Sequence, residues 1–194
     1  MREYKLIAHR GSHKYAKENS LFSFFNAINE NYYGFECDVR GTKDKKFYIY
    51  HDMLYDGKLF KSFNSNEIIC DTLESVLKLN TNKIILLEIK DPFINIDNLV
   101  KTLIKYKSKN IYVMSFYNNI IDKLNIKNKT YKIGILNYVL NTTENHFKYD
   151  FICILRPFLN DKIINFVKKN NKELFVYGNY NNNFTFNFPY YIVD

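Results

Sequence analysis

The segment Lys83-Ile84-Ile85-Leu86-Leu87-Glu88-Ile89-Lys90, KIILLEIK, places an unbroken apolar run before a carboxylate and a lysine. Such a run is typical of a parallel β-strand that is covered on both faces, because a strand with one face in water alternates apolar and polar residues. The segment therefore predicts an α/β fold with a buried parallel sheet.

Short apolar runs and amphipathic segments alternate along the rest of the chain. Strands are predicted at 4–9, 34–40, 46–51, 83–90, 110–116, 131–136, 151–156, 174–177 and 190–194, and helices at 20–31, 72–79, 96–107, 118–124 and 161–170, several after a cap such as Asn19 or Asn160. If 46–51 is an extension or a side hairpin of the second strand, eight strands remain. Eight strands that alternate with helices favour a compact (β/α)8 TIM barrel, with a doubly wound open sheet as the alternative.

The composition fits one domain over residues 1–194. The chain has 46% hydrophobic residues and no apolar run near the ~18 residues of a membrane span. No transmembrane segment is therefore expected. The N-terminus shows no signal peptide, so a cytoplasmic location is expected as well. The three cysteines lack CxxC spacing, which indicates reduced thiols rather than disulfides or a zinc site.

The net charge of +8 would suit an anionic partner such as nucleic acid or a phosphate ester. The lysines are scattered along the chain, however, and no nucleic-acid-binding signature accompanies them. A solvated, lysine-rich exterior is the simpler interpretation, and no nucleic-acid partner is expected.

Acidic side chains collect near the ends of two predicted strands. Glu36 and Asp38 share one strand face, and Glu88 lies near the end of KIILLEIK. In a barrel, interior positions at the carboxyl ends of the strands open onto the catalytic mouth, so the three carboxylates would meet there. A hard divalent cation, Mg²⁺ or Ca²⁺, would relieve their repulsion and suits all-oxygen ligands better than zinc does.

Four further side chains end strands at the same predicted rim. His9 and His51 could form an acid–base pair, since imidazole exchanges a proton near neutral pH. Arg10 and Lys90 would leave a positive rim able to hold a phosphate. Taken singly, a histidine at a strand end is ordinary surface, and Glu-x-Lys is an ordinary ion pair. The joint pattern at successive strand ends favours a site.

Other residues are assigned structural roles. His13 is expected to face solvent, and His146 has no partner that the sequence can name. On the first predicted helix, Phe22, Phe24, Phe25 and Ile28 are expected to face the core or to staple the helix end.

The chain resembles the glycerophosphodiester phosphodiesterase family, within the phospholipase-C-like phosphodiesterase barrels. The matching elements are His9-Arg10-Gly11, Glu18-Asn19-Ser20, Glu36-Cys37-Asp38-Val39 with Thr42 and Asp44, His51-Asp52, Thr72-Leu73-Glu74-Ser75-Val76-Leu77, Leu87-Glu88-Ile89-Lys90, Ser115-Phe116, Ile133-Gly134-Ile135-Leu136 and Tyr191-Ile192-Val193-Asp194. This ordered set spans nearly the whole chain and is far more specific than any one member.

The resemblance implies a (β/α)8 barrel that hydrolyses a phosphodiester with one divalent cation. It implies that Glu36, Asp38 and Glu88 hold the metal, that His9 and His51 act as base and acid, and that Arg10 and Lys90 neutralise the phosphate. In the family's usual scheme, a neighbouring substrate hydroxyl attacks phosphorus, and water then opens the cyclic phosphate. Gly11 would let the backbone turn away from a crowded mouth.

The chain departs from the family pattern in three places. The segment 53–71 is too short for the usual inserted segment on the glycerol side, which leaves substrate choice open. The seventh strand has no tryptophan, and Tyr177 could replace that aromatic wall. The chain stops at Asp194 without an eighth helix, so the flank could be covered by 179–188, by a second subunit in a homodimer, or by nothing.

Several functions are compatible with this pattern. The leading hypothesis is a phosphodiesterase acting on a small diester or on a glycerol-phosphate unit of a polymer. A lysophospholipase-D-like enzyme is a close alternative, and the loop aromatics Phe60, Phe63, Phe93, Phe116 and Tyr117 could supply its apolar groove. A catalytically inactive barrel that binds phosphorylated ligands is the third hypothesis.

Overall fold

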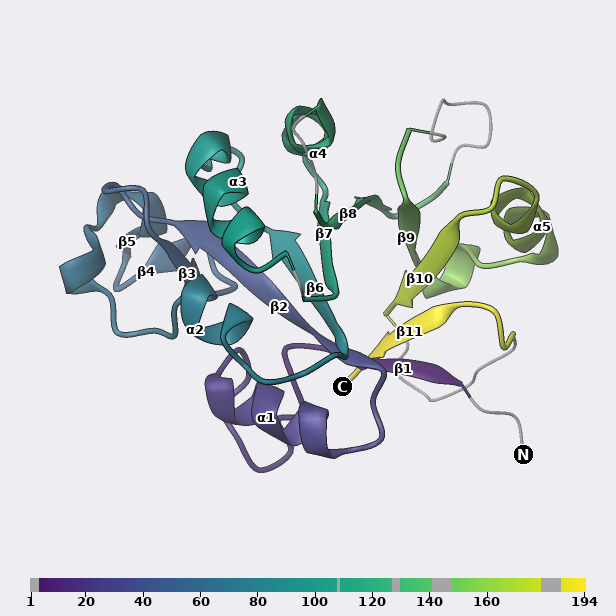
Figure 1. The fold of residues 1–194 in the computed structure, drawn as a ribbon, viewed down its shortest axis with the longest axis horizontal. Coiled ribbons are helices and arrows are strands. Elements are labelled where there is room, and N and C mark those ends of the chain that lie inside the picture. Colours follow the sequence, from purple (N-terminus) through teal and green to yellow (C-terminus); the bar gives the residue numbers. More distant parts are fainter. Residues whose placement is uncertain (1–3, 108, 127–129, 141–147, 179–185) are drawn as a thin grey trace.

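The protein is a closed parallel barrel surrounded by helices. The structure is a computed structural model and describes residues 4–107, 109–126, 130–140, 148–178 and 186–194. The barrel strands are β1 (Lys5–Ala8), β2 (Gly34–Gly41), β6 (Ile84–Ile89), β7 (Ile111–Ser115), β8 (Lys132–Asn137), β9 (Phe151–Leu155), β10 (Glu173–Tyr177) and β11 (Tyr190–Val193). The helices described are α1 (Leu21–Asn29), α2 (Leu73–Leu77), α3 (Ile96–Lys105), α4 (Asn118–Ile126) and α5 (Asp161–Lys169), and they lie outside the strands (Figure 1).

Strand pairing closes the barrel. The parallel order runs β1-β11-β10-β9-β8-β7-β6-β2, and β1 also pairs with β2 through Ile7 with Gly34 and Ala8 with Phe35. This confirms the compact (β/α)8 barrel and excludes the doubly wound sheet. Of the predicted cover of the last flank, residues 179–185 lie outside the described part of the chain, whereas Phe186 and Phe188 pack against the larger apolar cluster.

The short strand after β2 is a side hairpin, which was one of the two predicted alternatives. β3 (Phe47–Ile49) pairs antiparallel with the end of β2. Beyond it lie the hairpin β4 (Leu54–Tyr55) and β5 (Lys58–Leu59), then the 3₁₀ turns η1 (Phe60–Ser62) and η2 (Ser65–Glu67). A small cluster centred on Tyr48, Phe60 and Ile68 anchors this segment. Residues 53–71 are therefore packed onto the barrel.

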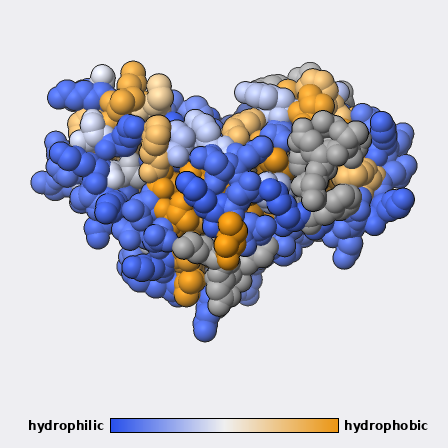
Figure 2. Space-filling view, turned by 90° about the horizontal axis from the view of Figure 1, so that it is seen from above, coloured by the Kyte–Doolittle hydropathy of each residue, from blue (hydrophilic) through white to orange (hydrophobic). Residues whose placement is uncertain are grey.

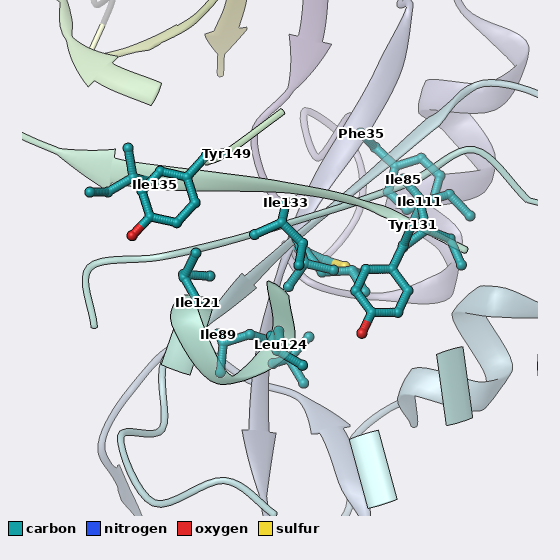
Figure 3. Packing of buried hydrophobic residues seen from close by; sticks show 14 of the residues in the cluster. Phe35, Ile85, Ile89, Ile111, Ile121, Leu124, Tyr131, Ile133, Ile135 and Tyr149 are labelled. Atoms are coloured by element: carbon teal, nitrogen blue, oxygen red, sulfur yellow. The ribbon is translucent and has the colours of Figure 1, made fainter. Parts of the chain in front are cut away.

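Strand parity divides the apolar side chains into two cores. Ile84, Leu86, Tyr112, Phe151 and Phe175 belong to the cluster inside the barrel. The larger cluster joins the outer strand faces to the helices; Figure 3 shows part of it, including Phe35, Ile85, Leu124, Tyr131 and Ile133. The face of the molecule in Figure 2 is largely hydrophilic with interspersed apolar residues, as expected for a lysine-rich exterior.

Two predictions for α1 were wrong. Its N-cap is Ser20, which forms a capping box with Ser23, because Asn19 is in the left-handed conformation at φ 52°. Of the aromatic residues on α1, Phe24 is buried, whereas Phe22 and Phe25 are exposed. A nine-residue helix buries only a narrow stripe, and these two residues lie outside it. The cap of α5 is Asn160, as predicted.

Candidate active site at the carboxyl mouth of the barrel

Three carboxylates from neighbouring strands meet at the carboxyl end of the barrel. Glu36 and Asp38 alternate with Cys37 on β2, and the β2–β6 register places Asp38 beside Glu88. Each carboxylate offers an oxygen within 4.8 Å of the other two. The exposed fractions are 1% for Glu36 and Asp38 and 8% for Glu88. The strand parity read from the sequence thus brings these three side chains together as predicted.

The cluster is electrostatically unfavourable without a cation. Burial raises the pKa of Glu36 well above its usual range, and the charges of Asp38 and Glu88 raise it further. Burial also raises the pKa of Glu88, although Lys90 partly offsets this effect. Glu36 Oε1 is buried and has no hydrogen-bond partner among the residues that the structure describes. An all-oxygen donor set with an unpaired buried oxygen fits a hard divalent cation.

Arg10 and Lys90 both point into the cluster. Arg10 Nε lies 3.2 Å from Asp38 Oδ2, and the Arg10 backbone N–H donates to Glu36 Oε2 at 3.1 Å. Lys90 Nζ lies 2.7 Å from Glu88 Oε1 and 3.4 Å from Asp38 Oδ1. Burial alone would lower the pKa of Lys90, but Glu88 and Asp38 raise it, so its positive charge is stabilised. Neither side chain forms the open positive rim that was predicted, because both are paired with carboxylates.

The two histidines lie at the mouth, each held by an aspartate. His9 Nδ1 lies 2.6 Å from Asp194 Oδ1, and His9 Nε2 lies 3.9 Å from Glu36 Oε2. His51 Nδ1 lies 2.8 Å from Asp52 Oδ1. An aspartate at Nδ1 favours the tautomer whose Nε2 is free to exchange a proton. Both rings are half-exposed and thus accessible to a substrate.

The turn after β1 sets the position of Arg10. Arg10 and Gly11 are both left-handed, at φ 53° and 81°. A Cβ atom on Gly11 would clash with Ser23 of α1, whose hydroxyl donates to the Arg10 carbonyl at 2.9 Å. Glycine is therefore required both by the backbone angle and by the close approach of the helix.

Several contacts of the site have no signature in the sequence. Asn19 donates to Asp38 Oδ2 at 2.8 Å and accepts from the Asp38 N–H at 3.2 Å. Glu18 pairs with Arg10 Nη1 at 2.8 Å. Both residues belong to the motif Glu18-Asn19-Ser20, but the sequence does not identify Arg10 and Asp38 as their partners. His13, predicted to face solvent, is half-buried, with Nδ1 2.9 Å from the Gly11 carbonyl oxygen. His146 lies outside the described residues.

Arg40 binds the backbone of two candidate site residues. Its Nε and Nη2 donate to the His51 carbonyl at 3.1 and 2.7 Å, and its Nη1 donates to the Lys90 carbonyl at 3.2 Å. Burial lowers the pKa of this guanidinium, although nearby carboxylates, Asp91 first, oppose the shift. Arg40 therefore fixes the loop that carries His51 against the end of β6.

Replacing Arg40 is expected to lower kcat more than it raises KM. Arg40→Lys cannot reproduce a planar fork that bridges two carbonyls, and a displacement of about 1 Å can cost ~10²-fold in rate. We expect a loss of roughly 10- to 100-fold in Arg40→Met and a smaller loss in Arg40→Lys. Steady-state kinetics beside thermal unfolding would check this. A loss of activity that merely follows the unfolded fraction would contradict a positioning role.

Comparisons with known proteins agree with this geometry. The sequence model described as "Glycerophosphoryl diester phosphodiesterase family" matches residues 9–83. YhdW of Bacillus subtilis (strain 168), a relative assigned to the glycerophosphodiester phosphodiesterases, is 37% identical over 76 residues, which cover 39% of this chain and 30% of the relative. The chain thus spans about a third of the length of that curated relative.

Solved structures share the fold over almost the whole chain. A glycerophosphodiester phosphodiesterase from Agrobacterium tumefaciens str. C58 superposes with a TM-score of 0.79 at 18% identity, covering 98% of this chain and 96% of that one. A Parabacteroides distasonis glycerophosphodiester phosphodiesterase gives 0.75 at 25% identity, covering 89% and 83%. An Oleispira antarctica phosphodiesterase in complex with the product sn-glycerol-3-phosphate gives 0.76 at 18% identity, covering 94% and 84%.

The chain thus has the fold of these phosphodiesterase structures, with an acidic cluster and two histidines at the mouth of its barrel. Over residues 9–83, its sequence is similar to the glycerophosphodiester phosphodiesterase family.

Proposed function

We propose that the protein is a metal-dependent phosphodiesterase that hydrolyses a glycerophosphodiester to an alcohol and glycerol phosphate, with residues 1–194 acting as one barrel domain. The observation that carries the proposal is the buried carboxylate trio flanked by two histidines, each with its Nδ1 on an aspartate. The substrate would be a small diester or a glycerol-phosphate unit of a polymer. Three expectations remain predictions: a cytoplasmic location, the lack of a nucleic-acid partner and a homodimer. Among the described residues, no helix is both long and apolar enough to span a bilayer.

Glu36, Asp38 and Glu88 would hold one divalent cation, Mg²⁺ or Ca²⁺, through carboxylate oxygens. When bound, the cation polarises the phosphoryl oxygens and lowers the pKa of the attacking hydroxyl. A cation on these carboxylates would compete with Arg10 and Lys90, which now neutralise them. The two side chains would then be available to bind the phosphate of the substrate.

His9 and His51 would move the protons. A substrate hydroxyl next to the phosphate gives its proton to His9 Nε2 and attacks phosphorus. The bond from phosphorus to the alcohol oxygen breaks, and His51 protonates that oxygen as it leaves. Water then opens the cyclic phosphate, with the two histidines in reversed roles. Asp194 and Asp52 keep each imidazole in the required orientation.

Metal-restored hydrolysis of two simple diesters tests the proposal. Chelator-treated protein is expected to leave glycerophosphocholine and glycerophosphoethanolamine intact. Added Mg²⁺, Ca²⁺ or Mn²⁺ is expected to restore release of glycerol phosphate from the wild type but not from Glu36→Gln. Turnover that survives the chelator, or that Glu36→Gln retains, would contradict the assignment of the metal site.

Two alternative functions remain. A catalytically inactive barrel is disfavoured because both histidines and all three carboxylates are present and converge. Tight metal binding without turnover of any diester would favour it. A lysophospholipase-D-like activity is favoured by an apolar groove beside the carboxylate cluster, which Met53, Leu59 and Phe93 line together with Lys90.

A further inference from the structure

Asn19 binds one of the two carboxylate oxygens of Asp38. Its Nδ2 donates to Asp38 Oδ2 at 2.8 Å, and its Oδ1 accepts the Asp38 backbone N–H at 3.2 Å. The second bond determines which end of the Asn19 amide faces the carboxylate, because only the amide oxygen can accept a backbone N–H. Two bonds between the same two residues hold the Asp38 carboxylate in one orientation.

Asn19 is itself anchored where α1 begins. Its backbone is left-handed at φ 52°, a conformation that asparagine tolerates better than most residues. Its N–H donates to the Arg10 carbonyl at 3.0 Å, and the next residue, Ser20, forms the capping box with Ser23. The Asn19 amide therefore reaches Asp38 from a turn that is fixed on both sides.

A second amide of the same loop binds one oxygen of Glu36. The Arg10 backbone N–H donates to Glu36 Oε2 at 3.1 Å, whereas Glu36 Oε1 has no hydrogen-bond partner within the described part of the chain. On Asp38, the oxygen that Asn19 leaves is Oδ1, which lies 3.4 Å from Lys90 Nζ. Each carboxylate on β2 thus has one oxygen bound to a neutral amide and a second oxygen available to a cation.

A divalent cation would disturb the neutral contacts less than the ion pairs. Arg10 Nε and Lys90 Nζ, which contact Asp38 at 3.2 and 3.4 Å, are positively charged and would be repelled by the cation. The Asn19 amide has no net charge, and hydrogen bonds of this kind to the outer oxygen of a metal-binding carboxylate orient the ligand. We therefore expect Asn19 to keep Asp38 Oδ2 when the cation binds.

The number of available oxygens bears on which cation fits. Ca²⁺ takes about six to eight oxygens in flexible geometry and often binds both oxygens of one carboxylate. Mg²⁺ requires a near-octahedral set at shorter distances, retains several waters and uses few carboxylate oxygens. Glu36 and Asp38, limited to one oxygen each, meet the requirement of Mg²⁺ better than that of Ca²⁺.

We propose that Asn19 is a positioning residue that limits Asp38 to one ligating oxygen, and that the site thereby selects Mg²⁺ over Ca²⁺. The inference rests on the proposed function in one respect, namely that Glu36, Asp38 and Glu88 bind a divalent cation. It does not depend on which diester is hydrolysed.

Calorimetric titration of the metal-free protein with MgCl₂ and with CaCl₂ tests this selection. The wild type is expected to bind Mg²⁺ at least as tightly as Ca²⁺. Asn19→Gly removes the amide and keeps a residue that adopts the left-handed backbone freely. Loss of such a partner costs ~10- to 100-fold in metal affinity. We expect that loss for Mg²⁺, and a loss smaller by at least about threefold for Ca²⁺, because Asp38 Oδ2 becomes available to the larger cation.

Asn171→Gly is the matched control. Asn171 is also left-handed, at φ 51°, but it lies in the turn between α5 and β10, at the amino end of that strand. The same substitution there is expected to leave both metal affinities unchanged. A wild type that binds neither cation or prefers Ca²⁺, or equal losses for the two cations in Asn19→Gly, would overturn the inference.

Hydrolysis of glycerophosphocholine by the same samples separates this inference from the proposed function. If the cations bind with the expected selectivity but no diester is hydrolysed, the proposed function fails and the role of Asn19 stands. If the diester is hydrolysed and Asn19→Gly has the metal selectivity of the wild type, the proposed function stands and the role of Asn19 is refuted.

Discussion

His51→Ala is expected to lower kcat for glycerophosphocholine by about 10²–10⁴-fold, and His9→Ala by a similar factor. Both side chains are half-exposed at the barrel mouth, so the thermal midpoint should change little. Steady-state kinetics at saturating metal, with circular dichroism of each variant, would measure both effects. Wild-type turnover in either variant would overturn the acid–base assignment.

The choice of leaving group distinguishes the two roles. A glycerophosphodiester of p-nitrophenol needs no protonation of its leaving oxygen. We therefore expect this substrate to restore most of the rate to His51→Ala, the proposed acid, and little to His9→Ala, the proposed base. His13→Ala is the matched control, since the His13 ring hydrogen-bonds the Gly11 carbonyl and has no assigned part in proton transfer. If the p-nitrophenol substrate instead restored the rate of His9→Ala, His9 would be the acid and His51 the base.

The metal-site geometry could be predicted because strand parity is a local property. Alternation along β2 places Glu36 and Asp38 on the same face whatever the rest of the chain does, and the end of β6 contributes Glu88. Closure of the barrel could also be predicted, because the sequence shows eight strands that alternate with helices. These features depend on periodicity, which the sequence displays directly.

The partners of these residues could not be predicted, because they depend on closure and on loop geometry. Asp194 reaches His9 only because β1 pairs with β11, across 185 positions of the chain. Asn19 resembled a helix cap by composition, but its left-handed backbone turns the side chain toward Asp38. The role of Arg40 could not be predicted either, since its acceptors are backbone carbonyls that carry no side-chain signal.

Glu36→Gln is expected to abolish metal binding and turnover while stabilising the metal-free protein. In the wild type, a divalent cation at a hundred times its Kd would add about 2.7 kcal/mol to the free energy of unfolding. At about 2–4 °C per kcal/mol, that raises the Tm by roughly 5–11 °C. Removing one of three clustered ligands should eliminate this shift, which differential scanning calorimetry with and without Mg²⁺ or Ca²⁺ would record.

The gain in stability of the metal-free Gln variant should depend on pH in a defined direction. Because the pKa of Glu36 is raised in the folded state, its ionised form is disfavoured there, and the penalty grows as pH rises from the unfolded pKa through the folded one. In acid, where the wild-type carboxyl is protonated in both states, the two proteins should unfold at similar temperatures. At neutral pH, Glu36→Gln should have the higher Tm.

Glu173→Gln is the control, because it removes a carboxylate that lies 2.8 Å from Lys132 at the start of β10. This variant should instead lower the Tm and leave the metal-induced shift intact. A Tm that falls at neutral pH in Glu36→Gln would mean that Arg10 and Lys90 already compensate the cluster in full, and the case for a cation at these carboxylates would lose its electrostatic basis.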